Sequence, residues 1–522
     1  MSFLTQAKTK RIVAVHGWSG VVLGLLLYVC IFTGSIVVFQ EEIDTWSQGV
    51  LTHNEGVGPR VDHHFRTAAR EVDEKYYEEI TIFGTPDGNV RYLFRTHVTG
   101  ENGGIEDDVV QLTVNPETGE VVDRWEGEIT ERERNPKAAL GDFWVDLHVQ
   151  LYMPRPWGLI VTGILGLAMM AAAVTGILLH KHLIRDAFVA ARDRARLVGS
   201  RDLHVLAGTW GLPFAIVLAF TGAFFSFAIS LGLPVMAMLA FGGDQAALME
   251  AFLGASKDLD LSPAPLASLD YIIADAVART DSYVQAIEIK NYNSVSAEVS
   301  VRLAAAAGSL SQFTLGYDGV TRAFLGESPG FGSAPSLSDD LVSIIGPLHF
   351  GNFAGFASKT VWLGLGLAVA YVTATGMLLW TKRREEVPLW QRFRQVIIIT
   401  IWGLPVAMLV SAVFYFVTLP AGDPEWWTPA GFLAGVAIAL LVGADRELAE
   451  RRLRLCFALL CVSLPILRHL TGGASWSEAL VAGQISVLAI DILLLVGGFI
   501  LLKQMRSGRS NEPGMFVQEP AE

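Results

Sequence analysis

Cysteine is scarce in this chain, which has three cysteines in 522 residues. No Cys-x-x-Cys-His sequence occurs, which excludes covalent attachment of a c-type haem. No group of four cysteines is available to hold an iron–sulfur cluster. All three cysteines fall inside apolar stretches, where they are expected to be small buried residues. They are Cys30, Cys456 and Cys461.

Charged side chains are also few, at 17% of the residues, whereas hydrophobic residues make up 52% and the mean hydropathy is +0.42. This composition predicts a polytopic α-helical membrane protein with sizeable soluble insertions. A helix needs about 20 apolar residues to cross a bilayer. The stretches that qualify lie at roughly 12–39, 157–180, 205–229, 355–380, 396–418, 428–444, 455–470 and 480–502.

The distribution of charge predicts an orientation. No cleavage site follows the first apolar stretch, so we expect it to remain as a helix. Lysine and arginine gather at the N-terminus, after the second, fourth and sixth stretches, and in the tail, which predicts that both termini are cytoplasmic in a bacterial inner membrane. The net charge of −13 comes from acidic segments between stretches, which are then periplasmic. Such acidic surfaces exclude a nucleic-acid partner. The partner that we expect for the apolar stretches is membrane lipid.

Two copies of one pattern organise the membrane stretches. In each copy a histidine is followed by a glycine four residues later and by a Thr-Gly pair at the same further offset. The copies are His16, Gly20 and Thr33-Gly34, and His204, Gly208 and Thr221-Gly222. Each histidine begins an apolar stretch at its cytoplasmic end, and the glycine leaves the same helix face open beside the imidazole.

A second pattern also occurs twice. A histidine precedes a Thr-Gly pair by 27 residues in one copy (175 − 148) and by 26 in the other (375 − 349). A helix of that length would span ~40 Å, more than a ~30 Å hydrocarbon core. These histidines therefore lie at the outer boundary, or the helix is interrupted, as Pro154 and Pro156 suggest for one copy. The Thr-Gly pairs are expected mainly to allow close helix packing. The copies are His148 with Thr175-Gly176 and His349 with Thr375-Gly376.

The two acidic segments predict small α+β modules. The first has an amphipathic helix at 60–80, strands at Ile80–Phe83, Val90–Thr96 and Val109–Val114, and a tight turn at Asn115-Pro116-Glu117-Thr118-Gly119. The second has a helix at Leu266–Ala278, strands at Val284–Lys290, Ser296–Leu303 and Gln312–Leu315, and Tyr317-Asp318-Gly319-Val320 at the place of that turn. The predicted divisions are 1–40, 41–145, 146–230, 231–345, 346–385, 386–509 and 510–522.

A helix-and-strand module with an Asn/Asp-Pro-x-Thr-Gly turn, set between membrane helices that carry these histidine motifs, resembles the PepSY-associated transmembrane family. The resemblance covers about residues 8–385. It implies duplicated two-helix units that form a four-helix haem bundle, two periplasmic PepSY-like insertions, and b-type haem, as in inner-membrane ferric-siderophore reductases. The last four apolar stretches lie outside it.

A b-type haem in a helical bundle needs two imidazoles at similar depth on different helices. The symmetric assignment pairs His16 with His204 around an inner haem and His148 with His349 around an outer haem. His180 is an alternative inner ligand, because it follows the first Thr-Gly-Ile-Leu-Leu sequence where the second copy has Trp380.

The paired His63-His64 has no repeated partner and is expected at a surface. Asp491 lies in an apolar stretch, where a carboxylate is costly; a proton path, a quinone contact and a pair with Arg468 or Thr471 all remain open.

Two haems near opposite faces would carry electrons across the membrane. No Gly-x-Gly-x-x-Gly follows a predicted strand, so we expect a separate donor, quinol or a cytoplasmic flavoprotein. The acceptor implied by the resemblance is a periplasmic ferric siderophore, which would release ferrous iron for uptake. The alternative is a haem-free membrane protein that binds or regulates a periplasmic peptidase, since PepSY modules also resemble inhibitory propeptides. A transporter has only faint support.

Overall fold

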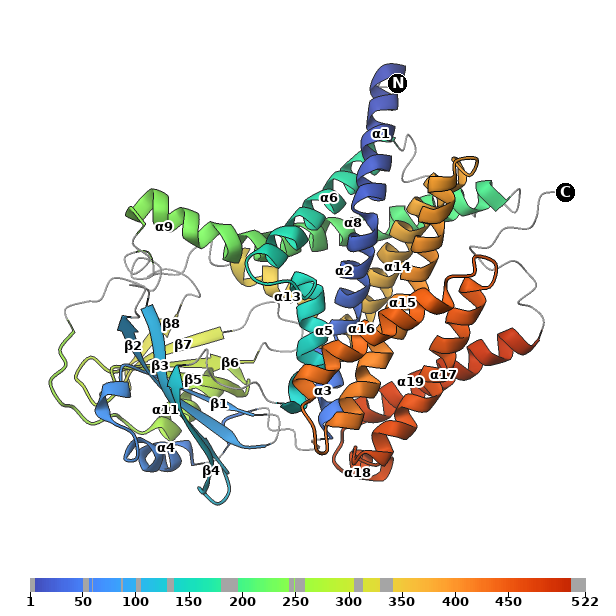
Figure 1. The fold of residues 1–522 in the computed structure, drawn as a ribbon. Coiled ribbons are helices and arrows are strands. Elements are labelled where there is room, and N and C mark those ends of the chain that lie inside the picture. Colours follow the sequence, from blue (N-terminus) through green and yellow to red (C-terminus); the bar gives the residue numbers. More distant parts are fainter. Residues whose placement is uncertain are drawn as a thin grey trace. The chain divides into compact units, whose positions relative to one another are not determined.

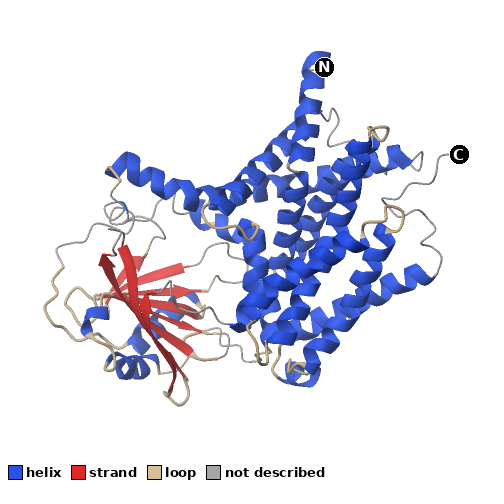
Figure 2. Cartoon of the chain, viewed as in Figure 1, coloured by secondary structure: helices blue, strands red, loops and turns tan. Residues whose placement is uncertain are grey.

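The computed structural model describes residues 5–49, 56–58, 60–85, 88–99, 105–128, 136–179, 196–243, 248, 259–304, 313–328 and 341–507. The chain divides into two compact units. A helical unit consists of Met1–Gly49, Arg134–Ser230 and Phe356–Glu522, and a sheet unit consists of Val50–Glu133 and Leu231–Gly355. Figure 2 shows the helices in blue and the strands in red. Each unit is described separately below.

The helical unit confirms the prediction of a polytopic helical membrane protein. Among the residues that the structure describes, seven helices are long and apolar enough to cross a bilayer. Their apolar composition leaves many large side chains exposed, as a lipid-facing surface requires. These helices are α6 (Trp157–Leu179), α8 (Arg196–Phe227), α14 (Gly355–Lys382), α15 (Pro388–Thr418), α16 (Pro424–Val442), α17 (Ala449–Leu470) and α19 (Ile485–Arg506) (Figure 1).

The first apolar stretch, predicted at 12–39, is bent and is not one continuous helix, although its two parts together are long and apolar enough to cross a bilayer. It forms α1 (Gln6–Val22) and α2 (Gly24–Val37), which meet at an angle of 66°. The bend follows a Ser19-Gly20 pair, a sequence typical of kinks. It also brings Gly24 so close to Met377 of α14 that a Cβ would lie 2.7 Å from the thioether sulfur.

The helical unit also contains shorter helices, of which three are α-helices in its described part. They are α3 (Gln40–Gln48), α5 (Ala139–Gln150) and α18 (Trp476–Val481). The sequence placed residues 41–49 and 134–145 with the first soluble module, whereas the structure assigns them to the helical unit. The reason is that their apolar side chains pack on membrane helices. Trp46 of α3 stacks edge-on against Phe416 of α15, with ring centroids 5.1 Å apart.

The sheet unit joins the two predicted modules into a single sheet, which corrects the prediction of two separate insertions. All eight strands are antiparallel, in the order β4-β3-β2-β1-β5-β6-β7-β8. Each module contributes four consecutive strands. They are β1 (Glu79–Gly84), β2 (Val90–Thr99), β3 (Ile105–Val114) and β4 (Val121–Glu128), then β5 (Val284–Lys290), β6 (Glu298–Leu303), β7 (Phe313–Asp318) and β8 (Phe324–Glu327).

The modules meet where β1 pairs with β5, with Ile80 opposite Ile289 and Ile82 opposite Ile287. All four side chains are fully buried in one core. Helices α4 (Val61–Ala69) and α11 (Leu269–Thr280) lie together against the sheet (Figure 1). Their ends are tied reciprocally: Asp62 accepts a hydrogen bond from the Leu269 N–H at 3.0 Å, and Asp270 accepts one from the Asp62 N–H at 3.2 Å.

The predicted turns are duplicated in detail. Asn115 Oδ1 accepts hydrogen bonds from the N–H groups of Glu117 and Thr118, at 2.9 and 3.1 Å. Asp318 Oδ1 does the same for Val320 and Thr321, at 3.0 and 2.7 Å. Short Asn and Asp side chains form this kind of turn readily. The sheet unit also contains η1 (Glu74–Tyr76), α9 (Leu233–Phe241) and α13 (Ile345–Phe350).

Candidate functional site

His16 lies on α1, half-buried, with its ring against α6. Its Nδ1 is 3.0 Å from Thr175 Oγ1 and 3.1 Å from the Ala172 carbonyl. The Thr175 hydroxyl proton is already directed at the Ala171 carbonyl, 2.6 Å away. Both groups near Nδ1 must therefore accept, so Nδ1 carries the proton and donates. The neutral ring then keeps its lone pair on Nε2, the form that binds a metal.

His204 on α8 repeats this arrangement with α14. Its Nδ1 is 3.1 Å from Thr375 Oγ1, and that hydroxyl donates to the Tyr371 carbonyl at 2.8 Å. The Val372 carbonyl, three residues before the threonine, also accepts from the ring, as Ala172 does in the first copy. The Nε2 atoms of His16 and His204 have no hydrogen-bond partner among the residues that the structure describes.

His148 is held in a related way in the last turn of α5. Its Nδ1 donates to the Cys30 carbonyl of α2 at 2.9 Å. Cys30 stands three residues before Thr33, so its carbonyl matches those of Ala172 and Val372 in the other two copies. The proton on Nδ1 again gives Nε2 the lone pair.

The glycines of the Thr-Gly pairs contact the same imidazoles. A Cβ on Gly34 would lie 2.6 Å from His148 Cε1, and one on Gly376 would lie 3.1 Å from His204 Cε1. On Gly176 the corresponding distance to His16 Cε1 is 3.7 Å. We expected these pairs mainly to pack helices together. The structure gives them a more specific role: the threonine or a nearby carbonyl orients a histidine, and the glycine makes room for its ring.

The histidines occupy two levels of the helical unit. His16 and His204 contact Thr175 and Thr375, which lie near the ends of α6 and α14. The start of α6 is tied to the end of α5, since Thr162 Oγ1 donates to the Val149 carbonyl at 2.8 Å. His148 is therefore near the start of α6, whereas His16 contacts Thr175 near its end. The distance from Thr162 to Thr175 along the helix is about 20 Å.

The helix is interrupted between the second-pattern histidine and its Thr-Gly pair in both copies, which was one of the two alternatives that the spacing left open. Helix α5 ends at Gln150 and α6 begins at Trp157. Helix α13, with His349 in its last turn, ends at Phe350 before α14 begins at Gly355. His349 belongs to the sheet unit, so its pairing with His148 stays a prediction. The alternative ligand His180 lies outside the described residues.

Tryptophans surround the His16 level. The Trp18 ring is 5.2 Å from Trp380 and 6.3 Å from Trp390, measured between centroids. The Arg384 guanidinium carbon lies 3.5 Å from the Trp380 ring centroid, in cation–π contact. Trp380 has the place in the second copy that His180 has in the first. The Trp380 ring lies against Gly17, the residue that follows His16.

A charged group lies at the His148 level, where α3 follows α2. Lys359 of α14 pairs with Glu41 at 2.8 Å and with Glu42 at 2.9 Å. In α3 itself, burial raises the pKa of the Asp44 carboxyl to about 7, and the negative charges of Asp142 and Glu41 add to the shift. The sequence did not single out this carboxylate, since only the tertiary structure buries it.

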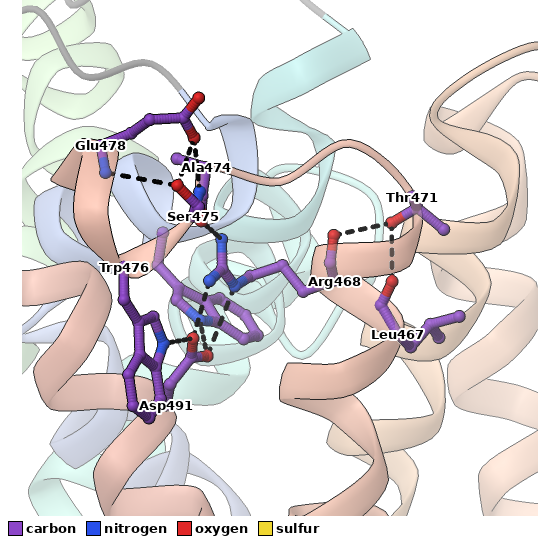
Figure 3. A network of polar contacts seen from close by, with 9 residues as sticks. Leu467, Arg468, Thr471, Ala474, Ser475, Trp476, Glu478 and Asp491 are labelled. Carbon is purple, nitrogen blue, oxygen red and sulfur yellow. Dashed lines mark hydrogen bonds and ion pairs between the residues drawn. The ribbon is translucent and has the colours of Figure 1, made fainter.

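Asp491 is the centre of a buried network (Figure 3). Arg468 donates to it from Nη2 at 2.7 Å and Nε at 3.3 Å, and both side chains are 1% exposed. The indole N–H groups of Trp46 and Trp476 complete the set, at 2.8 and 2.9 Å. Of the roles left open, the structure supports the pair with Arg468. A carboxylate with four donors is a structural junction between α3, α17, α18 and α19.

The structure also describes histidines outside the repeated motifs, in the sheet unit. His64 is buried, with Nε2 3.1 Å from the Pro116 carbonyl, so the surface interpretation of His64 is wrong. It is buried because it packs beneath the Asn115–Gly119 turn, where a Cβ on Gly119 would contact its ring. His97 pairs with Glu78 at 2.9 Å. Within the described ranges, no three His, Cys, Asp or Glu side chains are grouped to hold a metal ion.

The amino-acid sequence is similar to a known family model and to a bacterial protein. A family model described as the PepSY-associated TM region matches residues 13–383. The chain is also 27% identical over 388 residues to an uncharacterized protein of Pseudomonas aeruginosa, an alignment that covers 69% of this chain and 93% of the relative. The matched region holds all four repeated histidines and ends before α15.

Proposed function

Since this chain belongs to the PepSY-associated transmembrane family, we propose that it is a membrane electron-transfer protein that binds b-type haem. The observation that carries the proposal is the orientation of the imidazoles. His16, His148 and His204 each donate from Nδ1 to a fixed acceptor on another helix. Each neutral ring therefore keeps its lone pair on Nε2, which is the form of imidazole that binds a metal. A polar network that only joined helices would have no need to keep two Nε2 atoms free.

The residues present fit a haem. Haem iron takes neutral imidazole as an axial ligand, and a flat macrocycle needs small residues on the helix beside it. A Cβ added to Gly20, one turn after His16, would have no atom within 4 Å. We assign His16 and His204 to one haem, with His180 as the alternative ligand there, and His148 and His349 to a second.

The haem would supply one-electron transfer, and the protein would set its potential through the ligands and their hydrogen bonds. The threonine hydroxyls and the carbonyls fix the tautomer and orientation of each imidazole.

The direction of transfer follows from the proposed orientation in a bacterial inner membrane, with cytoplasmic termini and a periplasmic sheet unit. Electrons would enter from quinol or a cytoplasmic flavoprotein at the His16 level. They would leave at the His148 level to a periplasmic acceptor, for which we propose a ferric siderophore. Reduction weakens the hold of hard oxygen ligands on iron, and the ferrous ion is released for uptake.

A visible spectrum of the purified full-length protein tests this proposal. We expect reduced b-type haem bands and a pyridine haemochrome content of about two haems per chain. His204→Ala should remove one haem, while His148→Ala and His349→Ala should each remove the same other haem. His97→Ala, in the sheet unit, is the control and should leave the spectrum unchanged. Protein purified from haem-replete cells without these bands would exclude the proposal and favour the haem-free peptidase-binding alternative.

A further inference from the structure

We propose that helix α15, which lies beyond the family region, is a positioning element for His148. Through Ser411 it holds α5 in place and so sets the geometry of the His148 ligand. This inference rests on the proposed haem-binding role of His148. It gives a structural role to C-terminal helices that lie beyond residue 383, where the family match ends.

Helix α5 needs support from outside. It has only 12 residues, and isolated helices of that length are marginal. It is not continuous with α6, because Leu151 and Tyr152 both adopt positive φ values of 53° and end the helix. The direction of the His148 side chain therefore depends on what packs against α5.

One buried polar contact on α5 comes from α15. Trp144 stands one helical turn before His148 and donates from Nε1 to Ser411 Oγ at 3.0 Å. The Ser411 hydroxyl donates in turn to the Met408 carbonyl at 2.6 Å, so its role as acceptor for Trp144 is fixed. Trp144 is 6% exposed and Ser411 is fully buried. A buried hydrogen bond of this kind tolerates little displacement of α5, since an unpaired donor is costly.

Further contacts from the C-terminal helices act on the same segment. Tyr415, one turn after Ser411, donates from its hydroxyl to the Lys137 carbonyl at 2.7 Å, just before α5 begins. Phe143 meets Phe432 of α16 with ring centroids 5.4 Å apart. Contacts with α15 and α16 therefore reach α5 at its start and at its middle.

The effect should be confined to one haem. The acceptors that orient His16 and His204 come from α6 and α14, not from the C-terminal helices. Helix α15 does approach the His16 level through Trp390, but that residue is about 30 Å from Ser411 along the helix. The protein thus carries its own internal reference, because the second haem should not respond to a change at Ser411.

The test compares Ser411→Ala and Trp144→Phe in the full-length protein. Trp144→Phe keeps an aromatic ring and removes the N–H donor together with part of the indole volume. The control is Ser463→Ala on α17, which removes a hydroxyl that bonds only to the Leu460 carbonyl of its own helix. Readouts are haem content, a redox titration that resolves the two haems, and the electron paramagnetic resonance g values of the oxidised protein.

We expect both variants to retain both haems and to shift the midpoint potential and g values of one haem only. That haem is the one lost in His148→Ala. The double variant should shift it no further than the larger single shift, because both changes break one hydrogen bond. If both haems keep their wild-type values, or both shift equally, the positioning role is overturned while the haem proposal stands. If the wild-type protein has no haem, it is the proposed function that fails.

Discussion

At the scale of single residues, the threonine hydroxyls decide which imidazole nitrogen is available. The hydroxyl groups of Thr175 and Thr375 donate hydrogen bonds to carbonyls of their own helices. Each hydroxyl oxygen can therefore accept a hydrogen bond from a histidine on another helix. Such outer partners fix the orientation and basicity of a metal ligand. The same threonines without the histidines would be ordinary helix residues.

Replacing these threonines by valine should weaken haem binding without changing the side-chain shape. For Thr175→Val or Thr375→Val we expect a loss of about 10–100-fold in haem affinity at the His16 level, the range seen when such outer partners are removed. The measurement is haem retention during titration with apomyoglobin as a competitor. Thr400→Val on α15, whose hydroxyl bonds only to Val396, should behave as wild type. Equal retention in all three variants would contradict the role assigned to the two threonines.

At the scale of helices, the buried network around Asp491 joins the C-terminal helices to α3. Its charges are paired and hydrogen-bonded, which offsets the free energy that their desolvation costs. Removing one partner leaves a buried charge without its counterion. Because α3 contacts α5 at Gly141, where a Cβ would overlap the Asp44 carboxylate, this junction also borders the helix that carries His148.

Asp491→Asn should therefore destabilise the protein by about 3–5 kcal/mol, since Arg468 stays buried and charged. Thermal unfolding in detergent would register this as a lower midpoint. Adding Arg468→Met should recover part of the loss, because the uncompensated charge is gone. The exposed pair of Asp445 with Arg452 provides the control, and Asp445→Asn should change stability by less than about 1 kcal/mol. A midpoint for Asp491→Asn equal to that of the control would rule out the junction.

At the scale of the whole molecule, the sheet unit consists of two similar modules and shows what duplication achieves. Each module alone would expose β1 or β5 as a sheet edge, which is a site for aggregation. Pairing these strands buries both edges and merges two small cores into one. The modules should therefore unfold together, although 200 residues separate β1 from β5 along the chain.

A core substitution in one module tests this. Ile287→Ala in β5 should cost about 2–5 kcal/mol, since the side chain is fully buried opposite Ile82. Limited proteolysis followed by mass spectrometry should then show faster cleavage in both modules. Val98→Ala, at an exposed position near the end of β2, should leave the pattern unchanged. Faster cleavage confined to the second module would mean that the two halves are independent.

Local patterns in the sequence were enough to predict most elements. The apolar stretches became membrane-length helices, the alternating segments became strands, and the Asn115 and Asp318 turns formed as their residue types predict, because each depends on neighbours in the chain. The histidine motifs were also visible, since duplication repeats them at fixed offsets.

Contacts between distant residues were decided only by the tertiary structure. Thr175 meets a histidine 159 residues away, Thr375 one 171 residues away, and Cys30 one 118 residues away. The bend between α1 and α2, the pairing of β1 with β5 and the partners of Asp491 are of the same kind. The physical reason is that side-chain hydrogen bonds and core packing depend on which helices and strands become neighbours. The sequence shows which residues can ligate, and the fold decides which nitrogen of each imidazole carries the proton.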